Sequence, residues 1–305
     1  MRSLVFADKT VTVRITSGLG NQMFQYGAAL GLAEHLSATV QLDTSWFIGR
    51  KHRWYQLDQF QVPQAISNVQ AFRPARGRSL KTRAWQRLTG TRKRTNDSGD
   101  IGGYREPHYH FDPDFFKLSG ADNYIAGRFQ SPRYFADCAE RLRSEFQPVE
   151  PLGALAQAWA ERIAEAGRAS VSLHVRRGDY ARAPIHLLLG DSYYRRALTL
   201  MRRLLGMDLK VFLFSDDPDY VQSAFAELPH AHVVRTDPTR NWEDMVLMSR
   251  CHHHIIANST YSWWGAWLNS SEEKFVIAPA HWFTSDALAS RNVLDIYPDD
   301  WIILK

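Results

Sequence analysis

The N-terminal part of the chain has a pattern of apolar and polar positions that predicts a strand, a helix and a second strand. Residues 11–15, VTVRI, alternate apolar and polar side chains in the manner of a half-buried strand. Apolar positions then recur at a helical spacing from about residue 21 to residue 36, and TVQLD at 39–43 alternates again. We therefore expect a β-loop-α-β unit, the opening of a Rossmann-like domain.

The predicted helix carries small residues at about one-turn spacing. They are Gly27, Ala28 and Gly31. Small side chains allow a helix to approach a sheet closely, so we expect this side of the helix to pack against the sheet.

From residue 153 onward the pattern changes regularly between strand and helix periods. Strands are expected at 171–175, 210–214, 232–235, 253–257 and 274–278, with helices at about 191–205, 218–228, 241–250 and 260–269. Such alternation predicts a parallel, doubly wound sheet. Because a Pro/Gly-containing segment at 147–153 separates the two halves, we expect an α/β protein with Rossmann-like domains at 1–152 and 153–305.

The middle of the chain, from about residue 50 to residue 120, has no clear period. It contains a basic insertion near 71–105: nine Lys or Arg and no acidic residue lie between residues 71 and 94, so the net charge of +5 belongs to this segment. Residues 79–88 would form a short amphipathic helix. A solvated basic insertion is the favoured interpretation, and a helix on a membrane surface is the alternative.

Composition narrows the class of protein. A chain of 305 residues with 45% hydrophobic and 23% charged residues suits a soluble globular protein with a large core. No apolar run has the length of a signal peptide or a membrane span, and two cysteines are too few for a disulfide framework, so a cytoplasmic location is expected. Ten tryptophans suit core packing and, less strongly, the stacking of sugars or bases.

Unusual polar segments follow three of the predicted parallel strands. In an open parallel sheet, ligands bind outside the carboxyl ends of the strands, so these segments should line one cleft. They are Arg176-Arg177-Gly178-Asp179 after 171–175, Ser215-Asp216-Asp217-Pro218 after 210–214, and Asn258-Ser259-Thr260 after 253–257.

Each segment has a chemical use at such a cleft. Adjacent arginines offer planar forks for a diphosphate, and the carboxylates of SDDP accept from ribose hydroxyls or a guanine edge. The amides at the start of a helix, next to Asn258, Ser259 and Thr260, bind phosphate oxygens. Together the segments predict a diphosphonucleotide site without a lysine P-loop. The alternative for the arginines alone is an ion network with Asp179 or Asp217.

Metal and dinucleotide sites are weaker interpretations. The DPD sequences at 112–114 and 217–219 resemble carboxylate pairs that hold a divalent cation, but acidic caps on proline turns explain them better. The run His252-His253-His254 has no spaced partner for zinc, which favours structural histidines. The Gly18-Leu19-Gly20 loop with Asp43 is a weak dehydrogenase signal, because Met23 replaces the third glycine.

Four motifs resemble those of the α-1,2-fucosyltransferases of glycosyltransferase family 11. They are GLGNQMFQY at 18–26, HVRRGDY at 174–180, FSDD at 214–217 and NSTYSWWGAWL at 258–268, in the family's order. The resemblance implies a GT-B fold, in which two Rossmann-like domains face each other across a cleft. It also implies an inverting transfer of L-fucose from GDP-β-L-fucose to the 2-hydroxyl of a galactose, with no metal ion or other cofactor.

The resemblance also assigns roles to residues. His174 and Asp217 would contact guanine, Arg176 the β-phosphate, and Ser259 and Thr260 the diphosphate. The complete set expected on the donor side is His174, Arg176, Arg177, Asp216, Asp217, Asn258, Ser259 and Thr260. Asn21 and Gln22 would face the fucose or the acceptor.

Two residues are expected to act on the reacting atoms. Arg176 would stabilise the negative charge that develops on GDP as the sugar–oxygen bond breaks. Asp179 is the acid of the same motif; it would act as the base or only orient the arginines. A catalytically silent nucleotide-binding protein and a nucleic-acid-binding protein remain the alternatives to an enzyme.

The resemblance leaves the basic insertion unassigned. Bacterial members of this class often build surface polysaccharides on lipid carriers, and an anionic membrane surface would then lie within reach of residues 71–94. We therefore expect a galactose-terminated acceptor, with a lipid-linked form as one option, and a cytoplasmic protein for which the inner face of the membrane is the optional site of action.

Overall fold

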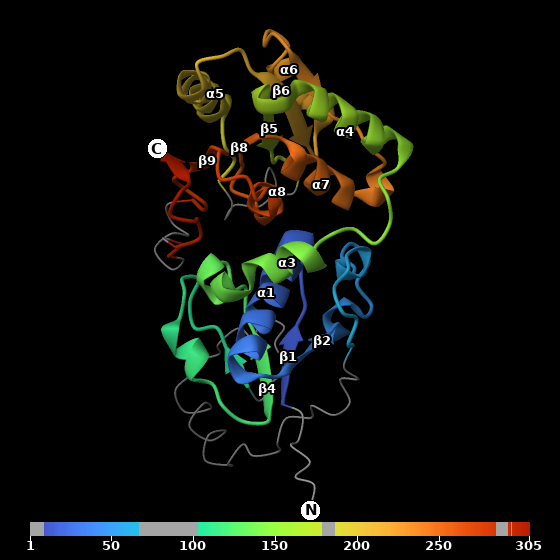
Figure 1. The fold of residues 1–305 in the computed structure, drawn as a ribbon, viewed down its shortest axis with the longest axis vertical. Helices are drawn as coiled ribbons and strands as arrows, with labels where there is room; N and C mark the ends of the chain where they lie inside the picture. Colours follow the sequence, from blue (N-terminus) through green and yellow to red (C-terminus); the bar gives the residue numbers. More distant parts are fainter. Residues whose placement is uncertain (1–8, 67–102, 179–186, 285–291, 294) are drawn as a thin grey trace, which may run out of the picture.

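The structure is a computed structural model that describes residues 9–66, 103–178, 187–284, 292–293 and 295–305. Two β-sheets, each made of parallel strands, lie one above the other along the long axis of the molecule (Figure 1). The first sheet lies before residue 127 and the second after residue 169, on either side of the predicted boundary. The assignment of 1–152 and 153–305 as domains remains a prediction.

The first sheet has four strands in the order β2-β1-β4-β3, all parallel. Its strands are β1 (Thr10–Arg14), β2 (Thr39–Asp43), β3 (Tyr104–Arg105) and β4 (Asp122–Ala126). Helix α1 (Leu19–Leu36) connects β1 to β2, as the sequence predicts, and begins two residues before the expected start because Gly18 is its N-cap. Strand β3 lies in the part of the chain that shows no clear period, and β4 follows directly after it.

Gly27 and Gly31 of α1 do not serve the close packing on the sheet that we expected from the sequence. A Cβ atom added to Gly31 would lie 2.0 Å from the carbonyl oxygen of Tyr134, and one added to Gly27 would lie 2.9 Å from the ring of Phe135. The close contact is therefore with the segment after β4. The expectation is wrong because Gly27 and Gly31 face this segment, which periodicity alone did not reveal.

The second sheet has six parallel strands in the order β10-β9-β8-β5-β6-β7. The strands are β5 (Ser170–Val175), β6 (Lys210–Ser215), β7 (Ala231–Val233), β8 (His253–Ile255), β9 (Val276–Pro279) and β10 (Ile302–Leu304). The helices are α3 (Ala139–Glu145), α4 (Ala154–Ala166), α5 (Asp191–Leu205), α6 (Pro218–Ala224), α7 (Trp242–Arg250) and α8 (Thr260–Leu268). The predicted alternation is confirmed, whereas α3 and β10 were not predicted.

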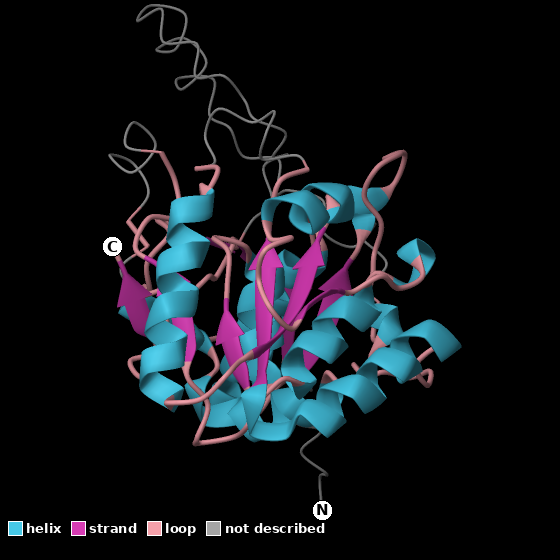
Figure 2. Ribbon diagram, turned by 90° about the horizontal axis from the view of Figure 1, so that it is seen from above, coloured by secondary structure: helices cyan, strands magenta, loops and turns pink. Residues whose placement is uncertain are grey.

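Short 3-10 helices occupy several of the connections. They are Ser45–Phe47, Leu57–Gln59, Pro113–Lys117, Pro132–Tyr134, Ala136–Cys138, Gly167–Ala169 and Pro238–Arg240. Helices cover both faces of the strands (Figure 2). In the second sheet, Val211 and Leu213 of β6 pack on the side of α5 and α6, while Phe212 and Phe214 point to the side of α4, α7 and α8. Because both faces are covered, residues 211–214 of β6, VFLF, are all apolar.

The starts of α1 and α8 meet between the two sheets. The indole nitrogen of Trp264 donates to the carbonyl oxygen of Gly20 at 2.9 Å. A Cβ atom on Gly20 would lie 2.6 Å from the carbonyl carbon of Thr260, so only glycine fits here. Phe24 packs against Trp263 and Trp264 with ring centroids 4.5 and 4.9 Å apart. The tryptophans of α8 therefore fill the core that joins the two halves.

Two further features concern the helices and the cysteines. In the part of the chain that the structure describes, no helix combines the length and the apolar character needed to cross a membrane. Cys138 and Cys251 are both buried and unpaired.

Candidate functional site

A cavity of about 830 Å³ lies where the carboxyl ends of the strands of both sheets meet. This volume is within the range of pockets that hold small ligands. Six of the residues that the sequence predicts for the site line it: Asn21, His174, Arg176, Asp216, Ser259 and Thr260. The first belongs to the first half of the chain and the others to the second, so both halves contribute to one cavity.

The carboxylate of Asp216 organises the turn that follows β5. Its Oδ2 lies 2.8 Å from Nη1 of Arg176, and its Oδ1 accepts the backbone amide of Arg177 at 2.9 Å. Gly178 leaves room for this carboxylate, because an added Cβ would lie 2.4 Å from Oδ2. The Arg176 side chain is about one quarter exposed and lines the cavity. A guanidinium held in this way is oriented before a ligand arrives.

Arg177 and Asp217 lie outside the cavity lining. Nε of Arg177 lies 3.3 Å from Oδ2 of Asp217, and the guanidinium stacks 3.5 Å above the ring of Tyr220. The other oxygen of Asp217 accepts the amide of Tyr220 at 3.2 Å and so caps α6. For this pair the structure shows the ion-pair alternative, and the predicted contact of Asp217 with guanine remains a prediction.

His174 is a buried and neutral residue at the end of β5. Burial lowers the pKa of this histidine to about 4, against the opposing effect of Asp216, while the charge of Arg176 also lowers it. Its ring lies 5.8 Å from the ring of Tyr261, and its buried Nδ1 has no hydrogen-bond partner among the described residues. A neutral imidazole that lines the cavity can donate or accept one hydrogen bond to a ligand.

The start of α8 presents Ser259 and Thr260 to the cavity. Ser259 is the N-cap of the helix, and its hydroxyl accepts the amide of Tyr261 at 3.3 Å. Asn258 lies outside the lining, because its buried amide nitrogen donates to the carbonyl oxygens of Leu187 and Trp282 at 2.8 and 2.9 Å. Asn258 therefore fixes the loop before α8. The N-terminus of α8, which is the positive end of the helix dipole, forms one wall of the cavity.

The residues predicted from the first motif have different positions. Asn21 lines the cavity and accepts a hydrogen bond from Gln130 at 2.7 Å. Gln22 is fully buried outside the lining: its amide donates to the carbonyl oxygens of Ser17 and Trp54 and accepts the amide of Gln56. Gln22 thus holds the loop before α1 against the segment after β2.

Two predicted features lie outside the described residues. These are Asp179, the candidate base, and the basic segment 71–94.

Several residues that line the cavity were not predicted from the sequence. Trp46, Arg53 and Arg128 line it from the first half, and residues 234–238 and Asp244 line it from the second. Burial raises the pKa of Asp244 to about 6. Residues 234–238 follow directly on β7, so the rule that identified the ends of β5, β6 and β8 would have found them too.

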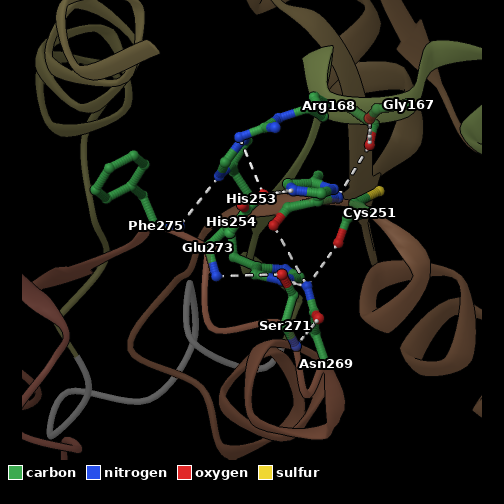
Figure 3. A network of polar contacts seen from close by, with 11 residues as sticks. Gly167, Arg168, Cys251, His253, His254, Asn269, Ser271, Glu273 and Phe275 are labelled. Atoms are coloured by element: carbon green, nitrogen blue, oxygen red, sulfur yellow. Dashed lines mark hydrogen bonds and ion pairs between the residues drawn. The ribbon is translucent and has the colours of Figure 1, made fainter.

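The three consecutive histidines lie at the amino end of β8, and none of them lines the cavity. Figure 3 shows His253 and His254 within a network of polar contacts. The side-chain amide nitrogen of Asn269 can only donate hydrogen bonds. It lies within hydrogen-bond distance of the carbonyl oxygens of Cys251 and His252 and of Nε2 of His254, at 2.9 Å from the last, so Nε2 accepts. Nδ1 of His254 then carries the proton and donates to Ser172. In the described part of the chain, no three His, Cys, Asp or Glu side chains are grouped to hold a metal ion.

Comparisons with known proteins identify the family of the chain and agree with its fold. Residues 102–305 match the family described as Glycosyl transferase family 11. The O-antigen biosynthesis glycosyltransferase WbnK of Escherichia coli is 30% identical, over 95% of this chain and 99% of its own length. The α-1,2-colitosyltransferase of Escherichia coli is 29% identical over 97% and 99%. A galactoside 2-α-L-fucosyltransferase of Caenorhabditis elegans is 24% identical over 95% and 78%.

A solved structure with the same fold is that of FUT1 of Arabidopsis thaliana in complex with GDP. It has a TM-score of 0.51 and 13% identity, with 95% of this chain and 75% of that chain covered. At this identity the likeness concerns the fold, and it confirms the predicted GT-B architecture.

Proposed function

The chain belongs to glycosyl transferase family 11 and is therefore an enzyme that transfers a sugar; we propose that it transfers L-fucose from GDP-β-L-fucose to the 2-hydroxyl of a galactose in a glycan. The motifs at 18–26, 174–180, 214–217 and 258–268 support this activity. Two relatives, an α-1,2-colitosyltransferase and a galactoside 2-α-L-fucosyltransferase, support the linkage.

One observation carries the proposal. Arg176, oriented by Asp216, lines the same cavity as the N-terminus of α8 with Ser259 and Thr260. A guanidinium and the free amides at a helix start both bind phosphate oxygens. We propose that the diphosphate of GDP lies between them, with His174 beside the guanine.

The departure of GDP requires stabilisation of negative charge. As the bond between C1 of fucose and the β-phosphate oxygen breaks, the electron pair stays on the phosphate. Arg176 is already held by Asp216, so it meets this charge without the cost of reorganisation. Because a fixed guanidinium supplies the stabilisation, the proposed reaction needs no metal ion and no other cofactor.

Inversion at C1 requires attack from the face opposite the leaving GDP. The 2-hydroxyl oxygen of the galactose forms the new bond to C1, and its proton passes to a base. We retain Asp179 as the candidate base. Asn21, which lines the cavity from the first half of the chain, would contact the fucose or the acceptor. Gln22 would act indirectly, by holding the loop before α1.

A second donor follows from one relative. The similarity to the α-1,2-colitosyltransferase favours GDP-colitose as the alternative donor, still within GDP-sugar transfer by a GT-B enzyme. A catalytically silent nucleotide-binding protein is the non-enzymatic alternative for the site, although the family is one of transferases.

The cellular setting is also a proposal. A cytoplasmic enzyme at the inner face of the membrane would meet a lipid-linked, galactose-terminated acceptor there. The net positive charge of residues 71–94 supports contact with anionic lipids. No nucleic acid is a partner in this account.

The test is an assay of the purified protein with GDP-fucose or GDP-colitose, a panel of β-galactosides, and EDTA in parallel samples. Mass spectrometry should detect addition of one fucose to a galactoside, undiminished by EDTA. Transfer from GDP-colitose but not from GDP-fucose would show that colitose is the sugar transferred. Loss of activity in EDTA would overturn metal independence. Binding of GDP without any product would support the catalytically silent alternative.

A further inference from the structure

A second, smaller cavity of about 360 Å³ lies at the carboxyl ends of the first sheet. Arg14 is the last residue of β1, Arg105 is the last residue of β3, and Ala126 is the last residue of β4; all three line it. Arg128 and Tyr109 line both this cavity and the larger one. The two cavities are therefore neighbours with a shared wall.

Three guanidinium groups belong to this small cavity. In the part of the chain that the structure describes, none of the three forms an ion pair with a carboxylate; they are Arg14, Arg105 and Arg128. The Nε atom of Arg14 is buried and has no hydrogen-bond partner among the described residues. A buried donor of this kind on a charged group is costly unless a ligand completes it.

Arg14 and Arg105 end the two strands that flank β4, and both line the cavity. Burial raises the pKa of the Tyr124 hydroxyl well above its usual value, while the charges of Arg14 and Arg105 both act to lower it. The two guanidinium groups thus act on the same hydroxyl, although they come from different strands. Arg128 also lines the cavity, and its Nη1 donates to the hydroxyl of Ser17 at 2.7 Å.

The nearby carboxylates are already engaged. Glu106 accepts the amides of Arg128 and Phe129 at 2.6 and 3.0 Å. Asp43, the neighbour of Arg14 in the β1–β2 pairing, accepts from the hydroxyl of Tyr124 and the amide of Ser45. Burial raises the pKa of Glu106 to about 7, which leaves it partly uncharged at neutral pH. Positive charge therefore dominates the cavity.

We propose that this cavity is a subsite for an anionic group of the acceptor, bound by Arg14, Arg105 and Arg128. The inference rests on the proposed function, since it assigns the larger cavity to the donor and the accepting galactose. An acceptor that reaches past Arg128 and Tyr109 would place its next unit in the smaller cavity. A carboxylate of an acidic sugar and a phosphate share the chemistry that the three arginines select.

The experiment compares three acceptors that share a terminal β-galactose. Lactose is neutral, galactosyl-β-1,4-glucuronic acid carries a carboxylate, and lactose 1-phosphate carries a phosphate. We expect kcat/KM at least tenfold higher for one of the charged acceptors than for lactose. The preferred one identifies the source of the charge as an acidic sugar or a phosphate-linked carrier.

Arg105→Ala tests the subsite directly, because Arg105 is exposed and its loss creates no cavity in the core. We expect the ratio of kcat/KM for the preferred charged acceptor to that for lactose to fall about tenfold. Arg203→Ala, which removes an exposed arginine from α5, is the matched control and should leave this ratio unchanged.

Two results overturn the inference. One is a wild-type kcat/KM for lactose that equals the values for both charged acceptors. The other is an equal change, in Arg105→Ala and Arg203→Ala, of the ratio of kcat/KM for the charged acceptor to that for lactose. Failure of the proposed function looks different: neither GDP-fucose nor GDP-colitose would then give a product with any of the three acceptors.

Discussion

The guanidinium of Arg176 lies 2.8 Å from Oδ2 of Asp216, whose other oxygen holds the amide of Arg177. One carboxylate therefore fixes both the side chain that lines the cavity and the backbone turn that carries it. Gly178 makes this arrangement possible by leaving space beside Oδ2. The relationship connects the two motifs HVRRGDY and FSDD, which lie on the neighbouring strands β5 and β6.

Replacement of Arg176 by alanine should lower kcat by about 10²-fold or more, because the charge on the departing GDP loses its fixed partner. The measurement is steady-state transfer at saturating GDP-fucose. Asp216→Asn is the informative companion: it keeps an acceptor for the Arg177 amide and removes the charge beside Arg176, so a smaller loss is expected. A nearly normal kcat in Arg176→Ala would refute the assignment.

The contact between α1 and α8 predicts a sensitive glycine. Gly20→Ala would place a methyl group 2.6 Å from the backbone of Thr260, and the overpacking should lower the free energy of unfolding by about 1–3 kcal/mol. Gly190→Ala is the control, since an added Cβ there meets nothing within 4 Å. Urea unfolding of both variants measures the difference. Equal stabilities would show that the two helix starts are not in close contact.

Glu106 predicts a change of stability with pH. Burial raises its pKa from 4.5 to about 7 in the folded state, so the folded protein holds this proton more tightly than the unfolded chain. The resulting stabilisation is present below pH 4.5 and is lost as the pH rises through 7. A shift of this size corresponds to about 3 kcal/mol.

The test for Glu106 compares Glu106→Gln with the wild type by urea unfolding at pH 5 and pH 8. Glutamine can still accept the amides of Arg128 and Phe129 through its oxygen, and it does not ionise. The variant should therefore gain stability relative to the wild type as the pH rises. The same difference at both pH values would contradict the raised pKa.

The histidine network predicts a structural role for Asn269. Its amide nitrogen donates to two backbone carbonyls and to His254, so Asn269→Ala leaves buried acceptors without a donor and should cost about 2–3 kcal/mol. Thr199→Ala, at an exposed position of α5, provides a control of similar size.

EDTA should leave the Tm of the wild type unchanged. A fall of Tm in EDTA would revive the zinc interpretation of His252-His253-His254.

The sequence predicts much of the fold because its strands and helices have strong periods. Strand 39–43 and helix 191–205 are predicted at the bounds that the structure shows, and the carboxyl-end rule brings the segments after β5, β6 and β8 to one cavity. Strand β3 has two residues and β4 follows an irregular stretch, so neither gave a period. Long-range pairing of β4 with β1, and the pairing of β3 with β4, make them strands.

The site is less predictable than the fold, because residue type does not tell which way a side chain points. Arg176 and Arg177 are identical and adjacent, yet only Arg176 lines the cavity while Arg177 stacks on Tyr220. Asn258 is polar and follows a strand, but its amide is used by the carbonyls of Leu187 and Trp282. These differences depend on contacts between segments far apart in the chain.

The smaller cavity shows the same limit. Arg14, Arg105 and Arg128 lie far apart in the sequence, and none of them belongs to the basic segment 71–94. Only the sheet order β2-β1-β4-β3 brings the ends of β1, β3 and β4 together. A search for arginines at strand ends would have required knowledge of β3 and β4.

The most direct test of the central claim is the linkage of the product formed from GDP-β-L-fucose and a β-galactoside. Nuclear magnetic resonance of the purified product should show an α-linked fucose on the 2-hydroxyl of galactose, formed by the wild type and at least about 10²-fold more slowly by Arg176→Ala. A β-linked fucose, attachment to another hydroxyl, or no product from the folded wild-type enzyme would contradict the account.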